Sequence, residues 1–554
     1  MLDKNEIDAL FPTDLPEAGH WENKYPPRHL GTGAQVTRFC PSPTGSLHLG
    51  GIYVAMLDKA VAQQSKGTYF VRIEDTDQAR EIAGVAAQFR RALDWYGLSS
   101  DESDERGEYG PYVQSCRSEI YLTYVRDLLR AGKAYPCFCT QQELVKLAEE
   151  QRSANVSAGY YGAWAPWRDA SRELVRQRLL AGDPYVIRFR SPGVPDRHVG
   201  FQDVIRGSLS LYDNRNDVVI LKSSESPLPL PTYHLAHVVD DHLMRVNLVI
   251  RGEEWIPSVP VHLQLFDALD FERVAYAHVA PLMKRSGSSR RKLSKRSDPE
   301  AAIEFYIAAG YPQSALIYYL RGLANSRLSY MPIADALKEP LRLSECGTAG
   351  PLVDLAKLDD IASDVIARTS SEEIASEVEN WAVAYDEELA AVMANNRRIV
   401  LRALDLDRTD VNQPRKDLKK WSDFRRVHGY LLKELFEPVT VANDPRFGGV
   451  SEEAIARLCS LFIEGYHGWA DSDRWFDQIR VAAVGSGFAL TVRDFKNSPS
   501  SYVGSIREAS QVIRVLLTGS TNSPPLHLIA NVLGDEEVKR RVCAVLNSIQ
   551  LSEN

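Results

Sequence analysis

A histidine and two glycines at the start of a candidate helix could bind a nucleotide phosphate. His48, Gly50 and Gly51 follow the segment 41–45, whose two prolines cannot continue a strand. Glycines at a helix start let a phosphate or a nucleotide ring approach the backbone closely. The histidine could then donate to a phosphate oxygen as negative charge develops on it. An ordinary helix start would carry the same residues, and this loop lacks the P-loop pattern GxxxxGK[ST].

A second segment could close on a polyphosphate because it is rich in positive charge. Residues 284–296 read KRSGSSRRKLSKR, and seven of these thirteen residues are lysine or arginine. This composition predicts a mobile cationic loop. A solvated run of charge, or a segment that only contacts RNA phosphates, would have the same composition.

One βαβ unit is predicted to position the histidine and the glycines. The spacing of apolar residues predicts a strand over 35–40, a helix over 48–65 and a strand over 68–73. Such a unit has parallel strands and a right-handed crossover. Ligands in open parallel sheets bind beyond the carboxyl ends of the strands, which is where the segment 41–45 is expected.

The rest of the chain is predicted to be an α/β half followed by a helical half. Residues 1–34 contain prolines and little periodicity, so we expect an extended lead-in. From about residue 299 onward the pattern is mostly helical. The other predicted elements are helices over 83–98 and 117–132 and strands over 185–189, 218–222, 246–250 and 275–283.

Length and composition exclude several classes of protein. The 554 residues suggest three to four domains at roughly 150 residues each. A net charge of −9 excludes a small basic DNA-coating protein, although a local basic surface remains possible. No apolar run reaches the roughly 18 residues of a membrane span, and the start lacks a secretion signal, so we expect a cytoplasmic protein without a membrane partner. Seven cysteines are too few for a disulfide framework.

Taken together, the two charged segments resemble the paired signatures of class I aminoacyl-tRNA synthetases. Residues 48–51, HLGG, match the HIGH motif, and residues 292–296, KLSKR, match the KMSKS motif. The pair is far more specific than either part. Further segments resemble glutamyl-tRNA synthetases of the bacterial type: RFCPSPTG at 38–45, RIEDTD at 72–77, PTYH at 231–234 and VIRGEEW at 249–255.

This resemblance implies a fold class of α/β followed by all-α. It implies a Rossmann-type doubly wound catalytic domain with an inserted acceptor-end-binding domain, then helical stem-contact and anticodon-binding domains. The implied parts are an N-terminal extension at 1–34, the catalytic domain at 35–114 and 231–298, the inserted connective domain at 115–230, the stem-contact region at 299–350 and the anticodon-binding domain at 351–554.

The resemblance also implies a glutamate–tRNA ligase, expected to be a monomer. Such an enzyme activates L-glutamate with ATP and Mg2+, and transfers it to the 3'-terminal adenosine of tRNA(Glu). One alternative is a paralogue that activates a different acid or supplies glutamyl-tRNA to a biosynthetic pathway. Another is a non-catalytic tRNA-binding relative. In the helical half, Trp421, Tyr430 and Trp475 could stack on anticodon bases, although a place in the helix-packing core is the simpler interpretation of each.

The family motifs give individual residues expected roles. His48, Lys292 and Lys295 would stabilise the phosphates during catalysis. ATP would be bound by His48, Gly50, Gly51, Glu253, Lys292 and Lys295, and glutamate by Arg38, Ser42, Glu74, Tyr233 and Arg251. Two cationic poles and one anionic pole suit a dicarboxylic amino acid. The simpler interpretations are that Glu74 or Arg251 forms a structural ion pair and that Tyr233 belongs to the core.

Three features depart from the family pattern. Cys137 and Cys139 match part of the zinc site of some bacterial relatives, but Trp167 stands where a later cysteine is expected, so we expect no zinc. Residues 223–230, SSESPLPL, replace a shorter turn and could either reshape the pocket or form a surface bulge. Cys40 stands where alanine is commoner.

Overall fold

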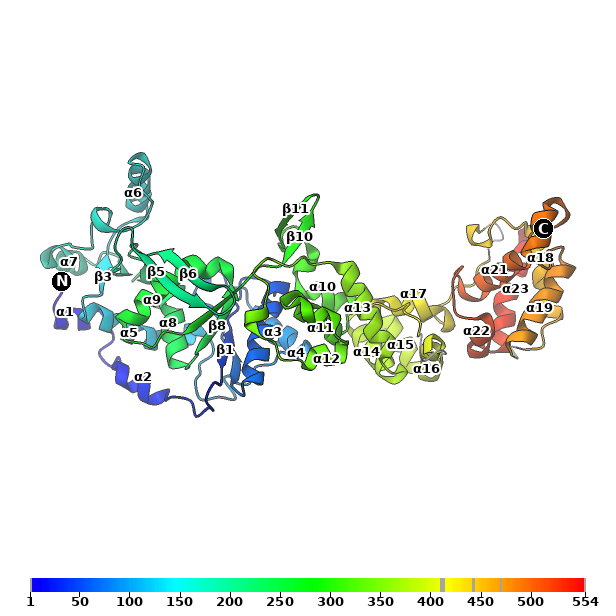
Figure 1. Ribbon diagram of the computed structural model, residues 1–554, viewed down its shortest axis with the longest axis horizontal. Coiled ribbons are helices and arrows are strands. Elements are labelled where there is room, and N and C mark those ends of the chain that lie inside the picture. The colour runs from blue at the N-terminus through cyan, green and yellow to red at the C-terminus, as the bar shows by residue number, and fades with distance from the viewer. Residues whose placement is uncertain (1, 409–413, 441–443, 469–470, 553–554) are drawn as a thin grey trace. The chain divides into compact units, whose positions relative to one another are not determined.

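The computed structural model describes residues 2–408, 414–440, 444–468 and 471–552 (Figure 1). The chain forms two compact units. The first contains Met1–Phe305 and Ile317–Asp354, and the second contains Tyr306–Leu316 and Leu355–Asn554. None of the helices in the described part of the chain has the length and apolar character needed to cross a lipid bilayer.

The predicted βαβ unit is present at the start of the first unit. It consists of β1 (Val36–Phe39), α3 (Leu49–Gln64) and β2 (Thr68–Val71). The two strands pair in parallel, from Val36 opposite Thr68 to Phe39 opposite Val71. All four residues of β1 are buried, as expected for a parallel strand covered on both faces. The chain therefore leaves β1 directly into the loop that leads to His48.

A second sheet carries the other wall of the site, with strand order β6-β5-β9-β8. Its strands are β5 (His198–Asp203), β6 (Gly207–Tyr212), β8 (Leu248–Gly252) and β9 (Ala275–Val279). β8 and β9 run in parallel, with Arg251 opposite His278, and they confirm the strands predicted near 246–250 and 275–283. The hairpin of β5 and β6 was not predicted.

A third sheet has the order β3-β4-β7. Its strands, β3 (Ala134–Cys137), β4 (Val186–Phe189) and β7 (Val219–Leu221), are antiparallel. The helices around the sheets are α4 (Val85–Trp95), α5 (Ser118–Arg130), α6 (Gln141–Ser153), α7 (Arg172–Leu180), α8 (Tyr233–Leu243) and α9 (Val259–Ala268). The predicted helices over 83–98 and 117–132 and the strands over 185–189 and 218–222 are confirmed.

The N-terminal segment is not the extended lead-in that we predicted. It contains two short helices, α1 (Lys4–Asp8) and α2 (Ala18–Lys24). Trp21 is buried in the same core as α5 and α8, and its indole N–H donates to Thr123 Oγ1 at 3.0 Å. Prolines between the helices interrupt the periodicity, although the apolar residues of the segment are still packed.

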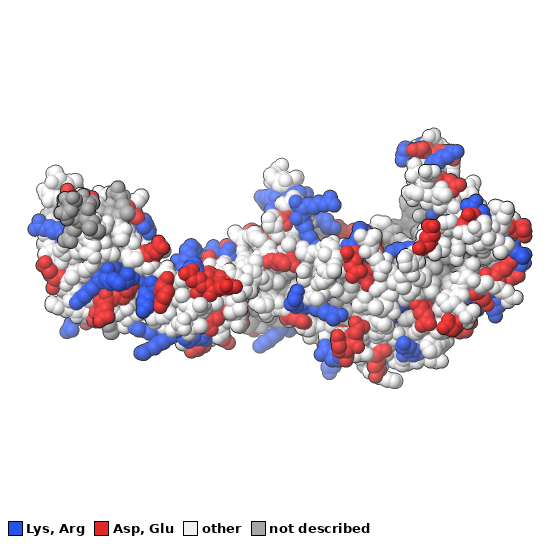
Figure 2. Space-filling view, turned by 180° about the vertical axis from the view of Figure 1, so that it is seen from behind, with Lys and Arg blue, Asp and Glu red and all other residues white. Residues whose placement is uncertain are grey.

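The cationic segment is also more ordered than predicted. Most of it forms an antiparallel hairpin of β10 (Met283–Ser286) and β11 (Ser289–Lys292), with Gly287 in the left-handed region at φ +59°. Lys284 and Arg291 both pair with Asp298, which fixes the base of the hairpin. In the space-filling view, Lys and Arg atoms gather on this projection (Figure 2). Only the residues after β11 form a loop.

From residue 293 onward the described part of the chain is helical and contains no named strand. The helices are α10 (Ile303–Ala309), α11 (Gln313–Ala324), α12 (Ile333–Lys338), α13 (Leu355–Arg368), α14 (Ser371–Tyr385), α15 (Glu387–Asn395), α16 (Arg397–Asp405), α17 (Phe424–His428), α18 (Glu452–Glu464), α19 (Ser472–Gly485), α20 (Val492–Asn497), α21 (Ile506–Thr518), α22 (Leu526–Leu533) and α23 (Asp535–Ser552). Trp421, Tyr430 and Trp475 are all buried in the cores of the second unit, so the simpler interpretation of these aromatics holds.

Candidate active site

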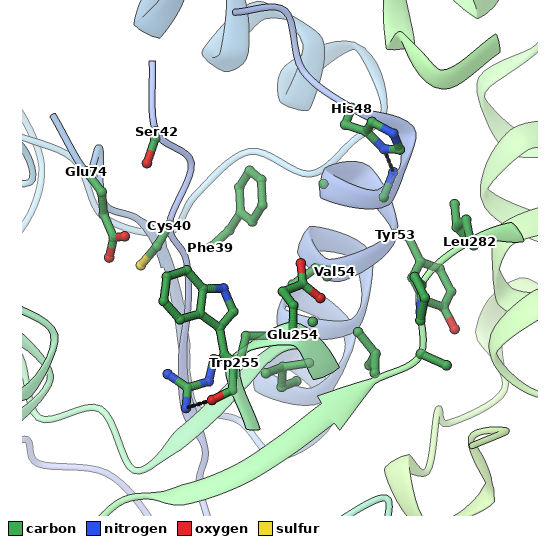
Figure 3. A pocket seen from close by; sticks show the side chains of 18 of the residues that line it. Phe39, Cys40, Ser42, His48, Tyr53, Val54, Glu74, Glu254, Trp255 and Leu282 are labelled. Carbon is green, nitrogen blue, oxygen red and sulfur yellow. Dashed lines mark hydrogen bonds between the residues drawn. The ribbon is translucent and has the colours of Figure 1, made fainter. Parts of the chain in front are cut away.

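One cavity in the first unit gathers most of the predicted site residues. It has a volume of about 410 Å3 and lies where β1 and β8 end and α3 begins. The predicted residues that line it are Arg38, Ser42, His48, Gly50, Gly51, Glu74, Tyr233, Arg251 and Lys292. Figure 3 shows Glu74 on the left of the view and His48 to the upper right, with Trp255 below and between them. The cavity therefore has one end near Glu74 and another near His48.

His48 caps the N-terminus of α3. Its Nδ1 accepts a hydrogen bond from the Gly50 N–H at 2.9 Å, so the proton of the neutral ring is on Nε2. Burial lowers the pKa of His48, the charges of Lys295 and Lys292 lower it further, and the Leu293 backbone opposes them. The ring is therefore neutral near pH 7 and can donate from Nε2 to a phosphate oxygen.

Gly50 and Gly51 leave the backbone bare at this end of the cavity. A Cβ atom on Gly51 would lie 2.9 Å from Leu47 Cδ1 and 3.2 Å from Phe39 Cζ. A Cβ atom on Gly50 would lie 3.1 Å from His48 Nδ1. Side chains at these positions would displace their neighbours, whereas the glycines let a flat ring lie against the backbone.

The two predicted lysines lie at the end of the hairpin and just after it: Lys292 is the last residue of β11, and Lys295 follows three residues later. Lys292 lines the cavity, and its Nζ is 3.6 Å from the Glu254 carboxylate. This pair is largely exposed and contributes little stability, so Lys292 is free to exchange its partner for a ligand. Lys295 is outside the lining, and its Nζ donates to the backbone carbonyl of Ser46, two residues before His48.

Glu253, which we expected to bind ATP, does not line the cavity. Its carboxylate pairs with Arg206 of the turn between β5 and β6. Its neighbour Glu254 lines the cavity instead and is labelled in Figure 3. Both residues begin the short helix Glu253–Ser258, in which successive side chains point in different directions. The structure thus brings Glu254, rather than Glu253, to the site.

Two arginines share one aspartate at the Glu74 end. Arg38 Nε donates to Asp241 at 3.1 Å, and Arg72 Nη1 donates to the other oxygen at 2.6 Å. Burial would raise the pKa of Asp241, but the two guanidinium groups hold it well below its usual range. Arg72 also donates to Glu74 at 3.3 Å. Burial nevertheless raises the pKa of Glu74, so its ionised form would gain from a further cation such as an ammonium group.

Arg251 is a buried guanidinium at the end of β8 with only neutral partners. It is 6 % exposed, and no carboxylate in the described part of the chain forms an ion pair with it. Burial lowers the pKa of its two histidine partners, which are therefore neutral near pH 7. The partners are His278 Nε2 at 3.0 Å, Tyr233 Oη at 3.2 Å, His262 Nδ1 at 3.4 Å and the Trp255 carbonyl at 3.5 Å.

Aromatic and hydroxyl groups complete the wall near Arg251 and Glu74. The Tyr233 ring lies 4.2 Å from the Trp255 ring, between centroids, and both residues line the cavity. Ser42 lies on the loop after β1, on the same side of the view as Glu74 (Figure 3). Tyr233 is therefore part of the cavity wall and not only of the core.

The departures from the family pattern fall inside and outside the cavity. Cys40 lines it, and burial raises the pKa of its thiol, which favours the neutral, unreactive form. No residue of 223–230 lines it. That segment connects β7 to α8, and its two ends are joined by a hydrogen bond from the Lys222 backbone N–H to the Leu230 carbonyl at 3.1 Å. The interpretation as a bulge away from the pocket therefore fits this geometry better.

The cysteine pair lies around a tyrosine hydroxyl. Cys137 Sγ and Cys139 Sγ are 3.3 and 3.4 Å from Tyr160 Oη. The Trp167 backbone N–H donates to the same oxygen at 3.2 Å, so the position where we expected a further cysteine contributes a backbone amide here. The described residues include no group of three or more His, Cys, Asp or Glu side chains that could hold a metal ion.

Some lining and supporting residues were missed. Glu254 and Trp255 stand in the quoted segment 249–255, so closer reading of that motif could have included them. His262 and His278 touch Arg251 but lie on other elements, and no local pattern singles them out. Their role becomes visible only when α9 and β9 are placed beside β8.

Comparison with known proteins identifies the family. The description "tRNA synthetases class I (E and Q), catalytic domain" matches residues 35–333. A glutamate–tRNA ligase of Clostridium perfringens is 39% identical, covering 97% of this chain and 100% of that protein. The chain belongs to this family. A glutamate–tRNA ligase of Acetivibrio thermocellus is 38% identical, covering 98% of this chain and all of that protein.

The fold of this family member agrees with a solved structure. The crystal structure of a glutamate tRNA ligase from Elizabethkingia meningosepticum in complex with its amino acid has a TM-score of 0.75 and 26% identity. The match covers 93% of this chain and 99% of that one. A class I catalytic domain with a Rossmann-like sheet, followed by a mostly helical region, is therefore the architecture of this aminoacyl-tRNA synthetase, and members of this family use ATP.

Proposed function

We propose that the protein ligates L-glutamate to tRNA(Glu) in two steps within the cavity of the first unit. The observation that carries this proposal is the buried guanidinium of Arg251, which has no carboxylate partner among the described residues and lines the same cavity as His48 at the N-terminus of α3. A buried cation without a counter-ion is costly, and an anionic side chain of the substrate would remove that cost. An acidic amino acid and a nucleotide can therefore meet in one place.

In the first step, an oxygen of the glutamate α-carboxylate attacks the α-phosphorus of ATP. The bond from that phosphorus to the oxygen leading to the β-phosphorus breaks, and pyrophosphate leaves. The protein orients the two reactants and stabilises the charge of the transition state, so it needs no side-chain nucleophile. In the second step, a ribose hydroxyl of the terminal adenosine attacks the activated carbonyl carbon, and AMP leaves.

The chain divides these tasks between the two ends of the cavity. Arg251 and Tyr233 would hold the side-chain carboxylate of glutamate, and Glu74 would hold its ammonium group. Arg38 and Ser42, which also line the cavity, would lie near the α-carboxylate. Gly50 and Gly51 would receive the adenine ring. His48, Lys292 and Lys295 would stabilise the phosphates, with His48 donating from Nε2.

Magnesium would arrive with ATP, as part of the substrate, and would neutralise charge on the phosphates. For Cys137 and Cys139 we propose no zinc, because the position of the fourth ligand is occupied by Trp167. The enzyme is proposed to act as a monomer in the cytoplasm. One copy of the first unit supplies every predicted site residue, which supports the monomer.

The tRNA is proposed to contact several parts of the chain. The parts 115–230, 299–350 and 351–554 would contact its acceptor end, its stem and its anticodon arm, respectively. Since Trp421, Tyr430 and Trp475 are buried, the anticodon contacts would come from other side chains of the helical part.

The proposal is tested by ATP–pyrophosphate exchange in the presence of tRNA, with glutamate, glutamine and aspartate as candidate substrates. Exchange with glutamate alone is expected. Exchange only with another acid would replace this proposal by that of a retuned paralogue. Absence of exchange with all of them, together with tRNA binding, would favour a non-catalytic relative.

A further inference from the structure

A buried chain of three side chains ends at Arg251. Arg251 Nε donates to His278 Nε2 at 3.0 Å, and His278 Nδ1 lies 2.6 Å from Asp203 Oδ2. His278 and Asp203 are fully buried. The parallel register places Arg251 directly opposite His278 on β9, and Asp203 ends β5 on the other side of β9. Three strands thus contribute one side chain each.

The hydrogen bonds allow only one tautomer of His278. Arginine only donates, so His278 Nε2 must accept and carries no proton. An ionised carboxylate only accepts, so His278 Nδ1 must carry the proton that points at Asp203. Both requirements specify the same neutral ring.

Asp203 is itself held firmly in its ionised form. Its Oδ1 accepts hydrogen bonds from the backbone N–H groups of Ile205 and Arg206 at 3.0 and 2.9 Å. Its Oδ2 accepts one from the backbone N–H of His278 at 3.1 Å, in addition to the contact with the ring. Burial would raise the pKa of Asp203, but these bonds and His278 hold it below its usual range. Arg206 Nε also donates to the His278 carbonyl at 3.1 Å. Asp203 and Arg206, at the two ends of the turn between β5 and β6, therefore form hydrogen bonds with both the main chain and the side chain of His278.

The neutral imidazole separates the carboxylate from the guanidinium. Arg38 contacts Asp241 directly, so a local carboxylate already balances its charge. Arg251 contacts a carboxylate only through His278, so its orientation is fixed while its positive charge stays available to a ligand. A direct aspartate at the position of His278 would cancel the charge that selects an acidic substrate.

We propose that Asp203 and His278 are positioning residues for Arg251. Asp203 fixes the tautomer of His278, and His278 Nε2 fixes the plane of the guanidinium so that its terminal amino groups face the side-chain carboxylate of glutamate. This inference rests on the proposed function, because it assumes that Arg251 binds that carboxylate. It adds the means by which the inserted stretch 115–230, which contains Asp203, influences recognition of the amino acid.

The test uses the full-length enzyme with tRNA and measures exchange kinetics for glutamate and for ATP separately. His278→Leu should raise KM for glutamate by about 10-fold to 100-fold, by analogy with the loss on removing a residue that orients a metal ligand. KM for ATP, and kcat at saturating glutamate, should change by no more than about threefold. Asp203→Asn should shift KM for glutamate in the same direction, because the amide no longer dictates the tautomer.

Two further variants separate positioning from general damage. His278→Gln keeps an oxygen that can accept from Arg251 Nε, so its rise in KM for glutamate should be clearly smaller than that of His278→Leu. Asp213→Asn is the matched control: Asp213 is also buried, binds Gln264 at 2.8 Å and the Val194 N–H, and does not touch the cavity. It should leave KM for glutamate unchanged.

Each result supports or overturns the inference. An unchanged KM for glutamate in His278→Leu or Asp203→Asn overturns it, and so does an equal rise in KM for glutamate and ATP. If His278→Leu fails to fold, Asp203→Asn and His278→Gln are judged instead: a KM for glutamate that is unchanged in both, or that rises no more than KM for ATP, overturns the inference. If the unsubstituted enzyme shows no exchange with glutamate, it is the proposed function that fails, and this outcome is seen before any variant is made.

Discussion

Replacing Arg251 by glutamine should separate substrate recognition from stability. The variant Arg251→Gln removes a buried positive charge whose neighbours in the described part of the chain are all neutral. In the proposed complex, that charge would face the side-chain carboxylate of glutamate. Removing one partner of a buried charge pair costs about 2 to 5 kcal/mol. At about 1.36 kcal/mol per factor of ten, kcat/KM for glutamate should fall by about 30-fold to 5,000-fold.

In the absence of substrate, Arg251→Gln should not destabilise the protein. Arg251 pays for its burial without a counter-ion, so its removal should leave the melting temperature unchanged or raise it. Arg72 is the matched control because it is also buried but is bonded to two carboxylates, Asp241 at 2.6 Å and Glu74 at 3.3 Å. Arg72→Gln leaves Asp241 with Arg38 as its one remaining arginine partner among the described residues and removes the arginine partner of Glu74. It should lower the free energy of unfolding by about 3 to 5 kcal/mol.

The assay combines exchange kinetics with thermal and denaturant unfolding of the two variants. The expected pattern is a large loss of glutamate kcat/KM at unchanged stability for Arg251→Gln, and a large loss of stability for Arg72→Gln. If Arg251→Gln kept its kcat/KM for glutamate within tenfold while unfolding more easily, Arg251 would be a structural residue and the reasoning would be refuted.

Four further predictions concern other parts of the molecule. Lys295→Ala should lower kcat for exchange by about 100-fold to 1,000-fold at unchanged melting temperature, and unchanged turnover would remove Lys295 from the catalytic set. Trp21→Ala should cost about 3 to 5 kcal/mol in urea unfolding, because Trp21 is buried; a loss below about 1 kcal/mol would show that α2 is not part of the core. Elemental analysis should find no zinc bound at 137–139, and chelation should leave activity intact; stoichiometric zinc, lost together with activity, would contradict this. Burial lowers the pKa values of His234 and His237 to about 4 in the folded protein, against about 6.5 when unfolded, so stability should be full above pH 6.5 and fall as the pH drops toward 4. His234→Gln should reduce that fall, and an identical pH dependence in the variant would count against this cause.

Local patterns in the sequence were enough to predict the elements around His48. A strand, a glycine-containing helix start and a second strand follow within about forty residues, and periodicity detects each of them. The apolar run that became β8 was equally clear. Most cavity residues followed from the resemblance of short motifs, because those motifs lie on the strand ends and loops that line the cavity.

Features that depend on distant partners could not be predicted in this way. The hairpin of β10 and β11 is rich in charge, and its order comes from Asp298, which no alternating pattern reveals. Glu253 and Glu254 differ only in the direction that a short helix gives them. Trp21 looked like part of a proline-rich lead-in, yet its partner Thr123 lies about a hundred residues away.

The pairing of β5 with β9 bears on how such enzymes can be recombined. β5 and β6 belong to the stretch 115–230, which by its position in the chain looks like a removable insert. Yet β5 adjoins the catalytic strands, and it brings Asp203 against His278. A chimera that exchanges the whole stretch between relatives would replace the strand that pairs with β9 and the aspartate that contacts His278. Modular exchange should therefore succeed only when the cut leaves 198–212 with the parent that supplies β8 and β9.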